Sequence, residues 1–249
     1  MADPLHQFVI QKIIPIKIGG VDLSFTNSSL WMMIGIIVST TFISVAMKRK
    51  ALVPGRMQAF VEVFYELIAG IVRANIGSGG RVYFPFVFTI FVLVMMGNLL
   101  GLIPYSFTFT SHIIVTAALS FLVFGAVIVI SIARQGLHFF AHFAPPGAPW
   151  FVYPLLVPIE IVSFMARPIT HGLRLFANMM AGHIMLKVFA GFSVGLVASF
   201  GLVGFAAGII PMLVNSGLYL FELLIALLQA YVFAVLACIY LKDTVAEAH

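Results

Sequence analysis

The chain has 249 residues, of which 62% are hydrophobic and only 8% are charged. Soluble domains carry roughly 25% charged residues, so the composition excludes a soluble protein and predicts an integral membrane protein. The net charge of +5 comes mostly from lysines and arginines at the ends of apolar runs. This pattern is a topology signal and argues against nucleic-acid binding. The single cysteine, Cys238, excludes an intrachain disulfide.

The apolar runs are long enough for membrane-spanning helices, and the alternating segments of a membrane barrel are absent. We therefore expect one all-α integral membrane domain, residues 1–249. It should hold two or three upright transmembrane helices, one amphipathic interfacial helix and a C-terminal hairpin of two long, steeply tilted helices. In chain order we expect a surface segment at 1–26, helices at 29–47, 55–75 (amphipathic), 84–103 and 111–133, and long helices at 154–189 and 205–241.

The N-terminal segment alternates in polarity on both sides of Gly19-Gly20, which predicts a small surface hairpin. It lacks the features of a signal peptide, so the first span is expected to serve as the insertion signal. Asn27 or Ser28 is the expected N-cap of that span. The span ends at the basic run 48–50, which predicts a cytoplasmic end and an N-terminus on the opposite side.

The helix at 55–75 has a charged face and an apolar face, so it should lie on the membrane or against a partner helix. The glycine-rich segment 77–81 should be a flexible loop. In the next span, Asn98 is expected to form packing hydrogen bonds, in preference to a role in a proton path. Gly97 and Gly101, four residues apart, should allow a helix to pack closely.

Residues 135–153 read as a proline-rich linker. His138 and His142 in this linker have a spacing compatible with a metal site, but no third ligand lies nearby. Interfacial histidines are therefore the favoured interpretation.

Each of the two long C-terminal helices is expected to have about 35 residues, against the roughly 20 that span a bilayer. The turn between them should lie near four glycines at 191–204. Continuous helices of this length must be steeply tilted. The alternative is that Pro158, Pro168 and Pro211 kink or break them.

Both long helices carry a polar stripe at helical spacing. In an antiparallel hairpin, residues at one level have a nearly constant sum of residue numbers. This rule places Arg174 level with Gln229, and His183 level with Glu222 nearer the turn. The stripe residues are Glu160, Ser163, Arg167, Thr170, His171, Arg174 and Asn178 on the first helix, and Asn215, Glu222 and Gln229 on the second.

Arg174 separates two groups that can exchange protons: the His183–Glu222 pair on the turn side and Glu160 on the other side. Because arginine keeps its charge, Arg174 can repel a proton but cannot relay one. The pattern indicates two half-paths for protons with a fixed positive barrier between them. The structural alternative is a buried Arg174–Glu222 ion pair that holds the hairpin together. The role of Arg167 stays open between an interfacial anchor and a functional charge.

The sequence of Gly172–Met179, followed by Ala181–His183, resembles the signature of subunit a of F-type ATP synthases. Pro104–Phe107 is also similar to that family, and the likeness covers essentially the whole chain. The resemblance implies a stator beside a rotating ring of subunit c. It implies an essential Arg174 with polar neighbours Asn178 and Gln229, an outer half-channel lined by His183 and Glu222, and an inner half-channel with Glu160.

The resemblance also implies that the chain has no cofactor, carries protons and is not an enzyme on its own. Its expected partners are the c-ring, the peripheral stalk subunit b, other synthase subunits and membrane lipid. The expected location is a bacterial inner membrane, or a mitochondrial one, with the C-terminus in the cytoplasm. No Gly-rich phosphate loop is present, so nucleotide binding is not expected.

Two features depart from the family pattern. The order of His183 and Glu222 is the mitochondrial-like one, and Gly101 stands where the family often has an acid. Two other functions remain open. A stand-alone ion-coupled transporter would use Arg174 to bind an anionic substrate and would move a solute without a partner ring. A structural anchor would keep its proton flux after Arg174→Ala.

Overall fold

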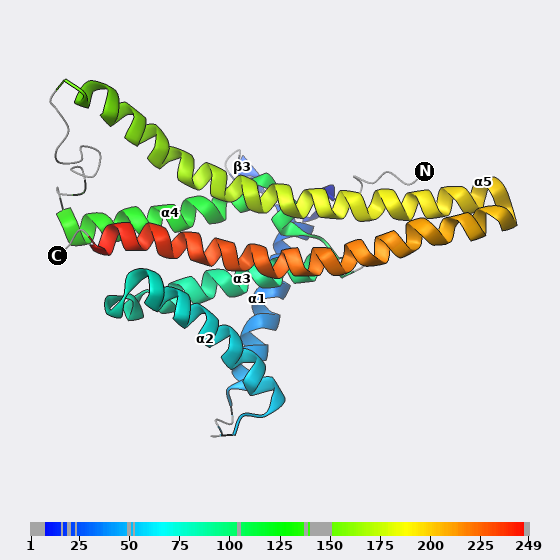
Figure 1. Cartoon of the computed structure of the whole chain (residues 1–249), viewed down its shortest axis with the longest axis horizontal. Helices are drawn as coiled ribbons and strands as arrows, with labels where there is room; N and C mark the ends of the chain where they lie inside the picture. Colours follow the sequence, from blue (N-terminus) through cyan, green and yellow to red (C-terminus); the bar gives the residue numbers. More distant parts are fainter. Residues whose placement is uncertain are drawn as a thin grey trace. The chain divides into compact units, whose positions relative to one another are not determined.

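The computed structural model describes residues 8–15, 17–18, 21–22, 24–48, 51, 53–103, 106–136, 139 and 151–246. It confirms an all-α membrane architecture with a long C-terminal hairpin (Figure 1). Within these ranges, five helical segments are long and apolar enough to cross a membrane. They are α1 (Asn27–Ala46), α3 (Phe84–Gly101), α4 (Ile113–Gln135) and the two arms of α5 (Tyr153–Ala246), at Tyr153–Gly201 and Val203–Lys242.

The chain divides into two compact units, and each unit draws on three separate stretches of sequence. The first unit consists of Met1–Lys48, Val92–His112 and Leu175–Tyr231. The second consists of Arg49–Phe91, Ile113–Arg174 and Val232–His249. The division falls within α5, so Arg174 belongs to the second unit while the polar residues nearer the turn belong to the first.

The N-terminal segment of the first unit forms short antiparallel strand pairs, as its alternation predicts. The innermost pair is β2 (Lys17–Ile18) with β3 (Val21–Asp22), and β1 (Lys12–Ile14) pairs with β4 (Phe25–Thr26). The predicted cap of α1 is wrong. Thr26 remains extended and its side-chain oxygen accepts a hydrogen bond from the Ser29 backbone N–H, so Thr26 is the N-cap. Asn27 instead donates to the carbonyl oxygen of Val9.

In the second unit, α2 (Arg56–Ile76) has the expected two faces. Its buried apolar residues include Val61 and Ile68, and the Tyr65 and Phe84 rings lie 4.6 Å apart, which joins it to the start of α3. The predicted loop after α2 is instead a short 3-10 helix, η2 (Ser78–Val82). The reason is local: Gly77 ends α2 with a φ of 79°, and the chain then turns at once onto the last turn of α2.

The turn of the hairpin lies at Gly201, one of the four glycines near which it was predicted, but the first arm extends beyond its predicted end at residue 189. Gly201 (φ 56°, ψ −125°) is the residue of α5 with non-helical backbone angles, and the helix continues past the glycines that were expected to end it. It also continues through Pro158, Pro168 and Pro211, so the predicted alternative of a proline break is wrong. The first arm has 49 residues and the second has 40. Both exceed the roughly 20 residues that a perpendicular span requires.

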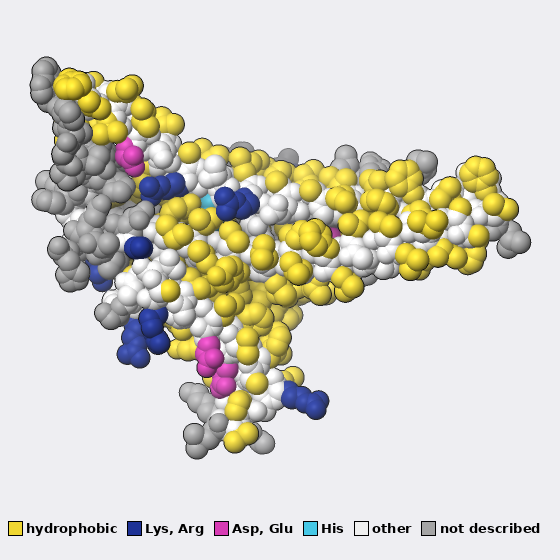
Figure 2. Space-filling model, in the orientation of Figure 1, with side chains coloured by type: hydrophobic (Ala, Val, Ile, Leu, Met, Phe, Trp, Pro, Cys, Tyr) yellow, Lys and Arg dark blue, Asp and Glu magenta, His cyan; other side chains and the backbone are white. Residues whose placement is uncertain are grey.

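Within the first unit the two arms lie side by side on both sides of this turn (Figure 1). The visible face of the arms near the turn is covered with hydrophobic side chains (Figure 2). Leu213 and Leu220 on the second arm are 68% and 67% exposed, as expected for a surface that faces lipid or a partner. Polar side chains of this unit that are instead buried include Asn98, His183, Glu222 and Gln229.

In the second unit, α4 and the first arm of α5 approach each other closely at Gly172. A Cβ atom at this position would lie 3.1 Å from the carbonyl oxygen of Thr116 and 3.3 Å from the Cα atom of Ala117. Four residues earlier, the carbonyl oxygen of Pro168 accepts a hydrogen bond from the Ser120 hydroxyl. A small residue and an interhelical hydrogen bond together hold the helices at this crossing.

Candidate functional site

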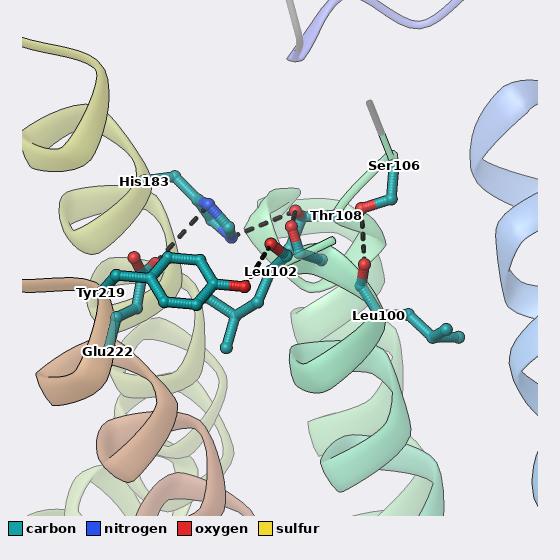
Figure 3. Close-up of polar contacts among 8 residues, drawn as sticks. Leu100, Leu102, Ser106, Thr108, His183, Tyr219 and Glu222 are labelled. Atoms are coloured by element: carbon teal, nitrogen blue, oxygen red, sulfur yellow. Dashed lines mark hydrogen bonds and ion pairs between the residues drawn. The ribbon is translucent and has the colours of Figure 1, made fainter. Parts of the chain in front are cut away.

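The centre of the first unit is a buried pair of side chains from opposite arms of the hairpin. His183 Nδ1 lies 3.5 Å from Glu222 Oε1, and the two residues are only 6% and 2% exposed. The sequence placed these residues at one level, and in the structure they are in contact (Figure 3). A carboxyl group and an imidazole at this distance can share or exchange a proton.

Space for the Glu222 carboxyl group comes from Gly182, the residue before His183. A Cβ atom at position 182 would lie 2.7 Å from Glu222 Oε1 and 2.9 Å from its Cδ atom. Any side chain at position 182 would therefore push the carboxyl group away from its present place. The glycine of the Ala181–His183 motif thus leaves the space that the Glu222 carboxyl group occupies.

The loop after α3 contributes a third group to this pair. Thr108 Oγ1 lies 3.1 Å from His183 Nε2, so each ring nitrogen of His183 faces a polar partner (Figure 3). The same hydroxyl lies 3.3 Å from the carbonyl oxygen of Gly101, at the end of α3. Thr108 is 2% exposed. Sequence reasoning missed this residue, because nothing in an uncharged loop marks a threonine as a partner of a histidine 75 positions away.

The expected use of the two small residues in α3 also needs correction. Gly97 and Gly101 do not receive a helix in the first unit; they receive the loop that follows α3. A Cβ atom at position 97 would lie 2.5 Å from the Phe109 ring, and one at position 101 would lie 2.5 Å from the Thr108 side chain. The loop, including its short 3-10 turn η3 (Phe109–Ser111), therefore folds back onto α3.

Two further hydrogen bonds join the second arm of α5 to α3 and to the residue that follows it. Asn98 is fully buried and its Nδ2 donates to the carbonyl oxygen of Ala226 at 3.2 Å, which agrees with the packing role favoured for it. The Tyr219 hydroxyl donates to the carbonyl oxygen of Leu102 at 3.1 Å (Figure 3). These bonds fix the helix that carries Glu222 against the helix that supports Thr108.

Asn178 and Gln229 form a second polar contact between the arms, farther from the turn. Asn178 Nδ2 donates to Gln229 Oε1 at 2.9 Å, and Gln229 is 3% exposed. The predicted level match of Gln229 with Arg174 stays a prediction, because those two residues belong to different units.

The second unit holds the remaining candidate residues. Arg174 is exposed on α5 and Glu160 is half-buried. The guanidinium of Arg167 lies 5.6 Å from the centre of the Phe164 ring and 5.9 Å from that of Tyr240, so its surroundings are aromatic. His171 is buried, with its ring 3.8 Å from that of Phe233.

The described part of the chain contains no group of three or more residues that could hold a metal ion. His138 and His142, for which a metal site was weighed, lie outside the described residues.

These observations define a class: a multi-pass membrane protein whose long helical hairpin buries a contact between an imidazole and a carboxyl group. A family model described as "ATP synthase A chain" matches residues 29–242. The chain belongs to this family.

Curated relatives agree over the full length. The protein named ATP synthase subunit a from Agrobacterium fabrum is 51% identical over 247 residues, covering 99% of each chain. The protein of that name from Mesorhizobium japonicum is 51% identical over 247 residues, covering 99% of this chain and 98% of its own. That from Rhodospirillum rubrum is 49% identical over 245 residues, covering 98% and 99%.

Proposed function

We propose that this chain is the a subunit of an F-type ATP synthase and carries protons to and from a rotating ring of c subunits. The observation that carries this proposal is the buried His183–Glu222 contact between the arms of the hairpin. Ionisable residues inside a membrane segment are expensive and mark ion paths far more often than they serve stability. The match to the ATP synthase A chain family supports the same function.

His183 and Glu222 line the outer half-channel, on the side of the membrane that faces the turn. A proton arriving there can be held by either group and passed on, because an imidazole and a carboxyl group can each bind and release a proton. On the opposite side, Glu160 belongs to the inner half-channel. The basic ends of the spans, including Lys48 and Arg134, support an outer N-terminus and a cytoplasmic C-terminus.

Arg174 separates the two half-channels. Its side chain is exposed although the helix around it is apolar, so a group outside this chain can reach and satisfy the charge. A ring carboxylate of subunit c has the required chemistry. The arginine attracts the deprotonated carboxylate, and its permanent charge stops protons from passing directly between the half-channels. A leak would dissipate roughly 2.3 kcal/mol for each proton at 100 mV.

The chain thus acts without a cofactor and without binding nucleotide. Beside the ring, its partners are the peripheral stalk subunit b, the other synthase subunits and membrane lipid. The location is a bacterial inner membrane.

The half-channel assignment is tested by passive proton flux through the reconstituted complex, measured in each direction under an imposed potential. We expect Glu222→Gln and His183→Ala to slow proton entry from the turn side more than proton release on the other side. We expect Glu160→Gln to have the opposite directional effect. If Glu160→Gln slows the same direction as Glu222→Gln, the two-path assignment is wrong.

The space at Gly182 allows a test that leaves both ionisable groups in place. Gly182→Ala should be tolerated by the fold, because the atom it meets is the far end of the flexible Glu222 side chain. The carboxyl group must move, however, and a displacement on the order of 1 Å slows transfer steps by up to roughly a hundredfold. We expect normal assembly with clearly slower proton entry from the turn side.

The matched control is Gly191→Ala, on the same helix, where a Cβ atom meets nothing within 4 Å. This variant should conduct like the wild type. Equal rates in the two variants would contradict a role for the Glu222 position.

A further inference from the structure

Thr108 brings its hydroxyl to a ring nitrogen of His183. Its Oγ1 lies 3.1 Å from His183 Nε2, while His183 Nδ1 faces Glu222. In the proposed function His183 and Glu222 line the outer half-channel, and the loop residue has no role there.

The loop holds Thr108 firmly in this place. Ser106 Oγ donates to the carbonyl oxygen of Leu100 at 2.5 Å, and the Phe109 ring fills the space above Gly97. The Thr108 side chain itself occupies the space that the missing Cβ of Gly101 leaves. Because these contacts surround a residue that is 2% exposed, its hydroxyl has little freedom to turn elsewhere.

A hydroxyl in this position can serve either protonation state of the imidazole. When His183 Nε2 carries no proton, the Thr108 hydroxyl donates to its lone pair. When Nε2 carries a proton, it donates to the hydroxyl oxygen, and the hydroxyl proton turns to the carbonyl oxygen of Gly101, 3.3 Å away. His183 therefore keeps a hydrogen-bond partner at Nε2 throughout a cycle of protonation at the ring.

We propose that Thr108 is a positioning residue for proton transfer through His183. It fixes the ring so that Nδ1 faces Glu222, and it exchanges its own donor and acceptor roles as the ring gains and loses a proton. A backbone N–H or a carbonyl oxygen could support only one of the two states. This proposal rests on the proposed function of the His183–Glu222 pair and adds the loop after α3 to the outer half-channel.

The test compares Thr108→Val, which keeps the branched shape and removes the hydroxyl, with Thr108→Ser, which keeps the hydroxyl. Both are measured in the complete synthase in lipid vesicles, as proton entry from the turn side and as the amount of assembled subunit. We expect normal assembly for both. Thr108→Val should slow entry by roughly five- to tenfold, the effect of one lost neutral hydrogen bond, and Thr108→Ser should restore most of the rate.

The matched control is Thr110→Val. Thr110 lies in the same loop, is fully buried, and its hydroxyl makes no hydrogen bond to any residue in the described ranges. Thr110→Val should therefore conduct at the wild-type rate. In the double variant Thr108→Val with His183→Ala, the loss should be no greater than in His183→Ala alone, since the hydroxyl acts through that ring.

Wild-type conduction by Thr108→Val would overturn the proposal, and so would a Thr108→Ser variant as slow as Thr108→Val. If Thr108→Val failed to assemble, Gly101→Ala would replace it, because a Cβ there meets the Thr108 side chain at 2.5 Å and displaces the hydroxyl without removing it. Unchanged flux in that variant would equally overturn the proposal. If His183→Ala itself conducts normally, the proposed function of the pair fails; if only the Thr108 variants do, this inference alone fails.

Discussion

Arg174→Gln is expected to abolish proton-driven ATP synthesis while the complete complex still assembles. Glutamine preserves much of the length of the side chain and its ability to donate hydrogen bonds, but it lacks the permanent charge that separates the half-channels. Removing a preorganised charge of this kind typically costs roughly 10²–10³-fold in rate. The measurement is ATP synthesis in vesicles energised by a pH step and a potential, together with the passive proton leak.

The chain offers a matched control seven residues earlier on the same helix. Arg167 has aromatic neighbours, Phe164 and Tyr240, and its cation–π contacts indicate an anchoring role. Arg167→Gln should retain most of the synthesis rate. Comparable loss in both variants would mean that any positive charge on this helix is required, which would contradict a barrier at Arg174 alone. Normal synthesis by Arg174→Gln would refute the barrier outright.

Gly172→Leu should prevent stable packing of α4 against the first arm of α5. The atoms nearest to a Cβ at this position belong to the α4 backbone, at 3.1 and 3.3 Å, and backbone cannot rotate out of the way as a side chain can. Overpacking of this kind costs roughly 1–3 kcal/mol, and a larger side chain lies toward the upper end. We expect little subunit in purified complexes and a lower unfolding temperature for what remains.

Gly191→Leu is the corresponding control, because its Cβ would meet nothing within 4 Å. That variant should accumulate like the wild type. Similar losses at both glycines would show that bulk anywhere on the helix is harmful, and the close approach at position 172 would then have no special weight.

The helices and the hairpin were predictable because their signal is local and repeated. Apolar runs of sufficient length predict membrane helices, and the spacing of polar residues predicts that His183 and Glu222 lie at one level of the hairpin. The boundaries were less predictable. Asn27 and Thr26 are both good capping residues, and the choice of Thr26 follows from the hydrogen bond of Asn27 to Val9, which the sequence does not reveal.

The end of the first long helix was placed too early, at residue 189, because Gly191 and Gly195 looked like helix breakers. A glycine weakens a helix by only about 1 kcal/mol relative to alanine, and a long apolar helix tolerates that cost. Within the described residues of α5, only Gly201 adopts a backbone conformation that other residues avoid. The helix also continues through Pro158, Pro168 and Pro211, because the loss of one backbone N–H is not enough to end such a helix.

No pattern in the sequence predicted the contact of Thr108 with His183. Its basis is the pair Gly97 and Gly101, whose spacing suggested a partner helix but equally fits a loop that folds back. Small residues indicate that another segment packs closely against the helix, but they do not indicate whether that segment is a helix or a loop. An uncharged loop with several hydroxyl residues directly after such a pair is the pattern that could have indicated this arrangement.

Because the turn is fixed at Gly201, the lengths of the two arms determine which side chains face each other across the hairpin. The distance along the chain from Gly201 to His183 and from Gly201 to Glu222 sets both the height and the direction of each side chain. One residue inserted in either arm would raise that arm by about 1.5 Å and rotate everything beyond it by about 100°. The buried polar face of that arm would then turn toward lipid. A change of length therefore keeps the pair in contact only when both arms change by the same number of residues and that number makes up whole helical turns. The number of residues between the turn and the pair is thus as much a part of the site as the residues themselves.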